Sequence, residues 1–208
     1  MAVVLYPYRR GASASMPVCW KFSHQCTAEP EQSVKTVELV TDRDIYTRII
    51  LEEIPRAGSF VWIGTSDLKD LYVAVRRRMA PFLEELSDLV QRGVAIRLIH
   101  AKEPGPAFRR DFDRYPSLID GMERILCPRV HFKCVVVDGR FAYMGSANLT
   151  GAGMGAKNER RRNFEMGIAT TDADIVRGIM DEFDGVWMGE HCGACDRKEF
   201  CADYRDLA

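Results

Sequence analysis

Four side chains suited to phosphate chemistry lie in one short stretch of the sequence: His131, Lys133, Ser146 and Asn148. A histidine in its neutral form can attack phosphorus. In its protonated form it can give a proton to a leaving oxygen. The lysine supplies positive charge for the non-bridging phosphate oxygens. The hydroxyl and the amide supply donors that stabilise charge developing in the transition state. These residue types predict a site that acts on a phosphodiester.

An Asp-Gly pair between two apolar runs predicts the β-hairpin that positions these groups. His131 and Lys133 are two residues apart, so they project from the same face of a strand, whereas Asp138 falls on the other face. With a two-residue turn, His131 lies opposite Ser146 and Lys133 lies opposite Met144. The asparagine two residues further along joins the same face. Because an aspartate before a glycine is a common turn residue, we expect a structural role for Asp138.

This pattern resembles the signature of the phospholipase D superfamily, in which His-x-Lys is followed after four residues by Asp and then, after six more, by Gly-Ser/Gly-x-Asn. The matching positions are His131, Lys133, Asp138, Gly145, Ser146 and Asn148. The resemblance implies an α/β fold, a phospholipase D-like mixed β-sheet flanked by helices, with one half-site per chain. It also implies an acidic residue on the next strand. Glu165, in the alternating run 163–168, is the candidate to orient the imidazole.

The resemblance further implies a two-step displacement through a covalent phosphohistidine, with a second histidine as general acid and no catalytic metal. The sequence holds one complete copy of the motif, since His24 and His191 have no lysine two residues later, and His100, which is followed by Lys102, has Ala107 at the position of the aspartate. We therefore expect a homodimer whose two-fold axis brings two His131 residues together.

Length and composition fit one globular domain. The 208 residues are 47% hydrophobic, and the net charge of -1 gives no overall basic field of the kind that nucleic-acid-binding domains have. We expect an irregular N-terminal arm over 1–35, a phospholipase D-like domain over 36–190 and a Cys-rich metal-binding tail over 191–208. The sequence has neither an apolar run long enough to span a membrane nor a basic leader, which predicts a soluble, cytoplasmic protein.

Periodicity predicts the elements that carry the hairpin. In chain order they are a helix over 42–54, a buried strand over 60–65, a long helical segment over 68–91 interrupted at Pro81, a strand over 94–99, a Pro/Gly loop over 101–112, the hairpin, a strand over 163–168 and a helix over 172–187. The order strand, helix, strand implies a right-handed crossover and a parallel pair. The last helix places Ile175, Ile179, Phe183 and Trp187 on one face, which is typical of a core face.

The cysteines form a second candidate site. Cys192-x-x-Cys195 beyond a helix can give two thiolates to a metal, and Cys201 can give a third. Cys127 is the preferred fourth ligand, because its Pro turn precedes the catalytic strand. Zinc and an iron-sulfur cluster both accept four thiolates. The alternatives are His191, Cys19 or Cys26 as fourth ligand, a redox Cys-x-x-Cys pair, and ordinary reduced thiols.

Arginines crowd the region after the motif. Arg160, Arg161 and Arg162, with Lys157 before them, form either a solvated loop face or a grip on flanking phosphates. An earlier group of arginines could extend this phosphate-binding surface: Arg109, Arg110 and Arg114. The favoured function is a nuclease acting on DNA or RNA. The alternatives are a phospholipase D-type lipid hydrolase and a non-catalytic nucleic-acid-binding module with a structural metal.

Overall fold

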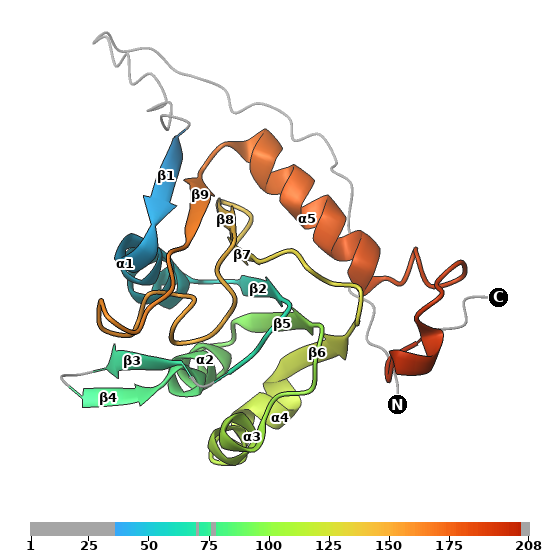
Figure 1. Cartoon of the computed structure of the whole chain (residues 1–208), viewed down its shortest axis with the longest axis horizontal. Helices are drawn as coiled ribbons and strands as arrows, with labels where there is room; N and C mark the ends of the chain where they lie inside the picture. The colour runs from blue at the N-terminus through green and yellow to red at the C-terminus, as the bar shows by residue number, and fades with distance from the viewer. Residues whose placement is uncertain (1–35, 70, 76–77, 205–208) are drawn as a thin grey trace, which may run out of the picture. The chain divides into compact units, whose positions relative to one another are not determined.

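The computed structural model describes residues 36–69, 71–75 and 78–204. Within these residues the chain forms a seven-stranded sheet in the order β1-β9-β8-β7-β2-β5-β6 and a separate β3-β4 hairpin (Figure 1). The strands of the large sheet are β1 (Val37–Thr41), β2 (Phe60–Thr65), β5 (Ala95–His100), β6 (Met122–Leu126), β7 (Cys134–Val137), β8 (Phe141–Gly145) and β9 (Met166–Thr170). The predicted arm over 1–35 lies outside the described residues.

The large sheet is mixed, as predicted. Strand β2 pairs in parallel with β5, and β5 in parallel with β6, which confirms the crossover through a helix. The other pairs, β2 with β7, β7 with β8, β8 with β9 and β9 with β1, are antiparallel. The α/β class with a mixed sheet flanked by helices is therefore confirmed.

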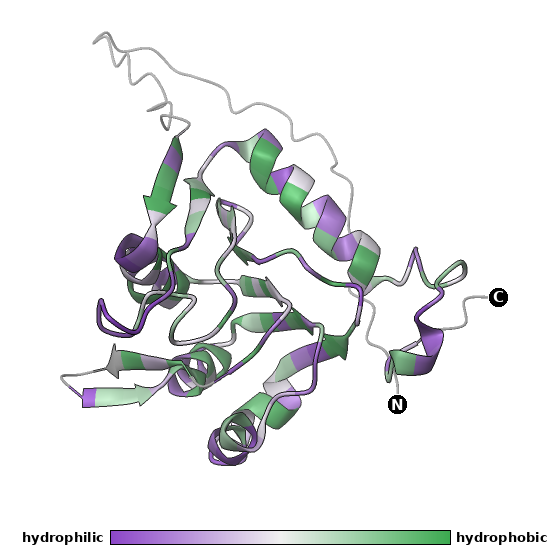
Figure 2. Ribbon diagram, in the orientation of Figure 1, coloured by the Kyte–Doolittle hydropathy of each residue, from purple (hydrophilic) through white to green (hydrophobic). Residues whose placement is uncertain are grey.

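Helices cover both faces of the sheet. On one face, buried residues of β2, β5, β7 and β8 pack in one core with the segment over 42–56 and with α2 (Phe82–Gln91). The other face is covered by α5 (Ala173–Trp187), whose Val176 packs on Val136 of β7 and Ala142 of β8. Figure 2 shows the alternating apolar and polar colouring along α5 that this half-buried position requires.

Helix α5 follows the predicted pattern with one difference. Asp172 caps its N-terminus, since the carboxylate accepts hydrogen bonds from the backbone N–H groups of Asp174 and Ile175. Phe183 and Trp187 are buried as predicted. Ile175 is 39% exposed. Val176 takes its place in the core.

The predicted long helix over 68–91 is wrong in its first half. That part contains the hairpin of β3 (Tyr72–Val75) and β4 (Arg78–Pro81), and α2 begins directly after Pro81. A proline has no backbone N–H and disfavours a helical conformation in the residue before it. The helix therefore starts at Phe82, whose N–H donates to the Leu71 carbonyl at 2.7 Å.

The predicted loop over 101–112 also differs. It contains α3 (Pro106–Phe112), which is followed by α4 (Ser117–Gly121) and by strand β6, neither of which the sequence pattern indicated. Pro106 occupies the first helical turn, where its missing N–H has no intrahelical partner to lose. The two candidate residues Arg109 and Arg110 therefore lie on a helix.

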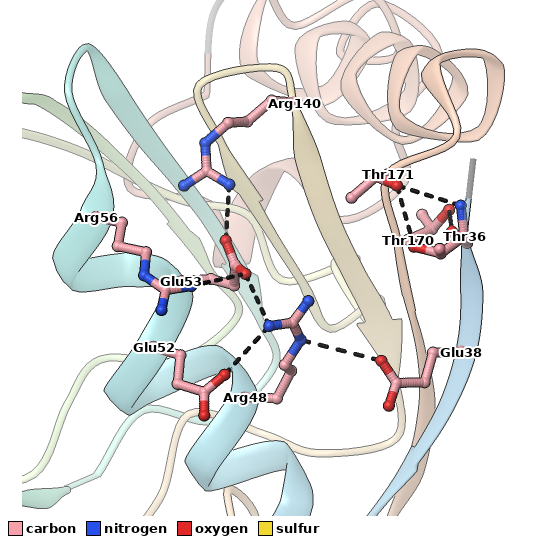
Figure 3. A network of polar contacts seen from close by, with 9 residues as sticks. All are labelled: Thr36, Glu38, Arg48, Glu52, Glu53, Arg56, Arg140, Thr170 and Thr171. Carbon is pink, nitrogen blue, oxygen red and sulfur yellow. Dashed lines mark hydrogen bonds and ion pairs between the residues drawn. The ribbon is translucent and has the colours of Figure 1, made fainter. Parts of the chain in front are cut away.

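The predicted helix over 42–54 is confirmed as a helical segment with three parts: α1 (Asp42–Ile45), the π-helical η1 (Tyr46–Glu53) and the 3-10 turn η2 (Ile54–Arg56). Glu53 is buried at the end of η1. Its carboxylate forms ion pairs with Arg140 at 2.7 Å, Arg48 at 3.1 Å and Arg56 at 3.6 Å (Figure 3). This network joins η1 to the turn between β7 and β8.

Candidate functional site

The strand register brings the predicted site residues to one edge of the sheet. At this edge β2 and β5 end with Thr65 beside His100, while β7 begins with Cys134 beside Gly64. Strand β8 ends and β9 begins at the same edge, where Gly145 pairs with Gly167. The carboxyl edge of parallel strands is where ligands usually bind in α/β sheets.

The predicted hairpin forms, but its register is one residue different. Arg140 N–H donates to the Val137 carbonyl at 3.0 Å, yet the ladder starts with Val137 opposite Phe141, so the loop has three residues instead of two. As a result Cys134, and not Lys133, lies opposite Met144. The residue next to Lys133 is Gly145, whose N–H donates to the Lys133 carbonyl at 3.0 Å.

Asp138 is a structural anchor in the hairpin turn. Its φ of 53° is in the left-handed region that aspartate tolerates. The carboxylate accepts backbone N–H bonds from Gly58 at 2.9 Å, Ser59 at 2.8 Å and Phe60 at 2.9 Å. Burial opposes the charged form, but these donors and Arg140 outweigh it and hold the pKa of the Asp138 carboxyl below its usual value. The geometry agrees with the structural role expected from the sequence.

His131 and Lys133 lie just before β7, not within it. The Lys133 Nζ is 3.3 Å from the His131 Nδ1 and donates to the His131 carbonyl at 2.5 Å. Lys133 is buried, and this burial lowers the pKa of its ammonium, with the Glu165 carboxylate opposing the shift. His131 is exposed. The site therefore pairs a buried cation with an imidazole that solvent or substrate can reach.

Asn148 is held by the end of β2. Its Oδ1 accepts hydrogen bonds from the Ser66 hydroxyl at 2.8 Å, the Asp67 backbone N–H at 3.1 Å and the Thr65 hydroxyl at 3.3 Å. With the carbonyl side so occupied, the Nδ2 group is the part of the amide left to donate. The sequence reasoning missed Thr65 and Ser66 as partners. Their only sequence signal is a polar pair directly after a buried strand.

Ser146 and Glu165 form a hydrogen-bonded pair between β8 and β9. The Ser146 hydroxyl donates to the Glu165 carboxylate and accepts the Met166 N–H at 3.2 Å, while the Asn163 amide donates to Glu165 at 3.0 Å. Glu165 precedes β9, whereas the sequence predicted it within a strand. These bonds give the Glu165 carboxylate partners on both sides, Ser146 and Asn163.

The backbone of Glu165 is fixed from the opposite end of the chain. Asp42 N–H donates to the Glu165 carbonyl at 2.9 Å, and Glu165 N–H donates to the Asp42 carboxylate at 2.9 Å. Asp42 has a φ of 45°, in the left-handed region that aspartate tolerates, and the reciprocal pair holds it there. Sequence reasoning did not indicate Asp42.

The predicted arginine run lies on the loop that leads to Glu165. Arg160 and Arg161 are exposed and Arg162 is half-buried. The loop turns on Asn158, whose carbonyl accepts the N–H groups of Arg161 and Arg162 at 2.9 and 3.0 Å. Among the described residues these three guanidinium groups have no ion-pair partner.

The earlier arginines have local partners. On α3, Arg109 bonds the Pro104 carbonyl and Glu103, and after α3 Arg114 pairs with Asp111 at 3.3 Å. Arg110 is exposed on the same helix. Because α3 follows β5, these residues come after a strand that ends at the edge of the site.

The structure brings the four predicted cysteine ligands to one cavity of about 230 Å³. It is lined by Cys127, Cys192, Cys195 and Cys201, together with His191. Within the described ranges, no three Cys, His, Asp or Glu side chains are arranged to hold a metal ion as they stand.

The cysteines differ in their surroundings. The pKa of Cys195 is lowered by the Arg197 N–H and by Arg129, whereas burial and the nearby Cys127 and Cys192 raise that of Cys201. Cys134 is on the strand itself, where burial raises its pKa to about 12. It is a buried small hydrophobic residue, as the sequence predicted.

Several solved structures have a similar fold. Nuc from Salmonella typhimurium, a phospholipase D family member, has a TM-score of 0.55 at 15% identity, covering 74% of this chain and 94% of that one. NucT from Helicobacter pylori has a TM-score of 0.53 at 15% identity, covering 72% and 94%. TrmBL2, an archaeal chromatin protein that binds DNA, has a TM-score of 0.52 at 14% identity, covering 76% and 55%.

A search of curated proteins found no match. In the part of the chain that the structure describes, no helix has the length and apolar character needed to cross a membrane. The family model described as "Cardiolipin synthase, PLD-like domain" matches residues 50–187, which include the whole hairpin, Glu165 and α5. The chain belongs to the phospholipase D superfamily.

Proposed function

We propose that this protein is a phosphodiesterase that cleaves nucleic acid through a phosphohistidine on His131, without a catalytic metal, in a homodimer. The observation that carries the proposal is the convergence at one sheet edge of His131, Lys133, Asn148 and the Ser146–Glu165 pair. Each supplies a group that phosphoryl transfer requires: a nucleophile, a cation, an amide donor and a carboxylate.

In the first step the His131 imidazole attacks phosphorus, forming a P–N bond while the P–O bond to the leaving group breaks. A second histidine, the partner subunit's His131, gives its proton to the leaving oxygen. In the second step that histidine takes a proton from water, the water oxygen attacks phosphorus, and the P–N bond breaks. His131 is exposed, so its ring can turn away from Lys133 to meet the phosphate.

The other residues hold the phosphate and the site. Lys133 provides a fixed charge close to His131, and its burial strengthens its interaction with a bound anion. Asn148 provides a donor whose orientation is set by three bonds to its carbonyl. We assign Glu165 the orientation of the imidazole in the substrate complex, with Ser146 positioning that carboxylate.

Homodimerisation is supported by an exposed apolar sheet face next to the site. Leu39, Ile168 and Met144 form one cross-strand row and are 70%, 39% and 46% exposed, and Val37 and Met166 extend it on the same face. Figure 2 shows the apolar colouring of β1 along this edge. These five residues, the apolar face, reach Ser146 through Met166. A contiguous exposed patch of this kind marks a binding surface, and a second copy would complete the site.

Nucleic acid is the proposed substrate because the loop that leads to Glu165 carries three guanidinium groups that have no ion-pair partner among the described residues. One of the fold neighbours is a chromatin protein that binds DNA, and two others carry the names Nuc and NucT, which fits this choice. We place the activity in the cytoplasm, since seven cysteines suit a reducing compartment better than an oxidising one.

The first test is turnover in excess chelator. Wild-type protein should hydrolyse bis(p-nitrophenyl) phosphate and single- or double-stranded nucleic acid, and His131→Ala should lower the rate at least about a thousandfold. His24→Ala, which lies outside the motif, is the matched control. A rate unchanged by His131→Ala would refute the mechanism. Cleavage of phospholipid vesicles in preference to nucleic acid would refute the substrate.

The second test concerns the dimer. Leu39→Glu with Ile168→Glu should convert a dimer into a monomer by sedimentation velocity and abolish turnover together. Ile119→Glu, which replaces a residue that is 63% exposed on α4, should leave both unchanged. A fully active monomer would contradict the shared site, whereas an intact dimer of the double variant would move the interface to another surface.

A further inference from the structure

We propose that Cys127, Cys192, Cys195 and Cys201 hold a [4Fe–4S] cluster that fastens the C-terminal tail to the segment leading to His131. This inference does not depend on the phosphodiesterase proposal, because it concerns a separate site and can be tested without any substrate.

The cavity that these cysteines line has walls from two distant parts of the chain. One wall lies in the segment between β6 and β7, over 127–132, and the other consists of the end of α5 and the tail that follows it. Val130, Phe132 and Val186 make part of the lining apolar. A site with thiols on both walls and apolar side chains between them suits a thiolate-bound group shielded from water.

The size of the cavity favours a cluster over a single metal ion. A tetrahedral Zn²⁺ at about 2.3 Å from each sulfur needs thiolates only ~3.8 Å apart. The four cysteines line one cavity of about 230 Å³, which is larger than a single ion needs. In a [4Fe–4S] cluster each thiolate binds a different iron atom, so the sulfurs surround a larger object. The size of the cavity fits the larger group.

The tail is already attached to the end of β6, directly before Cys127. Leu126 N–H donates to the Asp203 carboxylate at 2.7 Å, and the Cys201 thiol donates to the Leu126 carbonyl at 3.4 Å. These bonds place Cys201 beside Cys127. The tail is therefore already folded against this segment, and Cys201 lies beside Cys127 before any metal binds.

The remaining two ligands lie on a tight turn. Cys195 N–H donates to the Cys192 carbonyl at 3.1 Å, and the Arg197 N–H donates to the Cys195 sulfur at 3.4 Å. A backbone N–H bond to sulfur stabilises the thiolate form that a metal centre needs. The Cys192-x-x-Cys195 turn thus presents two thiols toward the cavity with a donor already on one of them.

The test is metal analysis of the full chain purified without oxygen. We expect about four iron atoms and four acid-labile sulfides per chain, with the broad visible absorption of a thiolate-bound cluster. One zinc per chain without sulfide would overturn the cluster. Protein that contains no iron, even after reconstitution with ferrous iron and sulfide, would overturn the site.

Variants identify the ligands. Cys195→Ser and Cys201→Ser should each lower the iron content at least twofold, while Cys134→Ala and the double change Cys19→Ser with Cys26→Ser should keep it. Loss of iron from the Cys19/Cys26 variant would overturn the ligand set. Because a ligand variant can also misfold, bleaching of the wild-type cluster by air should expose the tail to limited proteolysis, and an unchanged cleavage pattern would contradict its fastening role.

Discussion

Replacing Asp138 tests the conclusion that the aspartate of the motif is structural. In Asp138→Ala the N–H groups of Gly58, Ser59 and Phe60 lose their acceptor. A hydrogen bond to a charged group contributes about 1.5–3 kcal/mol, but the carboxylate is 17% exposed and water can reach part of this turn. We therefore expect the free energy of unfolding to fall by about 3–5 kcal/mol, including the strain of alanine at positive φ.

Asp138→Asn is the informative comparison. The Asp138 Oδ1 accepts from Ser59 and Phe60, so an asparagine keeps both bonds, and only the Gly58 N–H would face an amide N–H instead of Oδ2. Asparagine also tolerates the positive φ. The expected loss is about 1–2 kcal/mol, clearly less than for alanine.

The pH dependence follows from the lowered pKa of Asp138. The folded pKa lies below the unfolded value of about 3.9, so the stabilisation is complete above that value and is lost as the pH falls through the folded pKa. The stabilities of wild type and Asp138→Asn should therefore begin to approach each other as the pH falls below about 4, and should meet below the folded pKa of Asp138.

Urea denaturation of the three proteins at pH 7 and at pH 3 measures these differences. If the free energy of unfolding of Asp138→Ala lay within about 0.5 kcal/mol of the wild-type value, the structural role of Asp138 would be refuted. An Asp138→Asn variant of wild-type stability whose phosphodiesterase turnover is lost would also refute it, because Asp138 lies at the end of β7 opposite to His131.

Three further predictions use the same denaturation or binding measurements. Gly145→Ala would place a Cβ 2.6 Å from the Met166 carbonyl oxygen and should lower the free energy of unfolding by about 1–3 kcal/mol. Gly178→Ala has open space on α5 and should raise the free energy of unfolding by up to about 1 kcal/mol. A more stable Gly145→Ala than Gly178→Ala would contradict the packing. Glu53→Gln should lower the free energy of unfolding by about 1–3 kcal/mol, since it removes the charge at the centre of the arginine network in Figure 3, and unchanged stability would mean that the network contributes nothing. Changing residues 160–162 to serine should weaken duplex DNA binding and reduce its salt slope by up to about 2.7, and an unchanged slope would remove this loop from the interface.

The motif could be predicted from the sequence because its geometry is local. The turn at Asp138 and the strands beside it depend on residues close in the chain, and they form as expected. The register was wrong by one, because the loop has three residues; the third, Arg140, forms an ion pair with Glu53 from another element. Local signals do not contain that contact.

Two other misses also come from contacts between distant residues. Glu165 takes its position from Asp42, and Asn148 from the end of β2. The hairpin of β3 and β4 was missed because its apolar residues also fit a helical spacing until Pro81 interrupts it. That the four cysteines lie together was anticipated from the Cys-x-x-Cys spacing and the Pro turn at Cys127, whereas the cavity that they line becomes visible only in the fold.

The pairing of β1 with β9 has a consequence for synthesis. Thr36 at the start of β1 bonds Thr171 at the end of β9, and these residues are 135 positions apart. At about 5–20 residues per second, a ribosome needs roughly 7–27 s to make the intervening chain. During that time β1 has no strand to join, and closing so long a loop is a slow step in folding. We expect the sheet to assemble from β2 outward, with the earliest strand made being the last one incorporated.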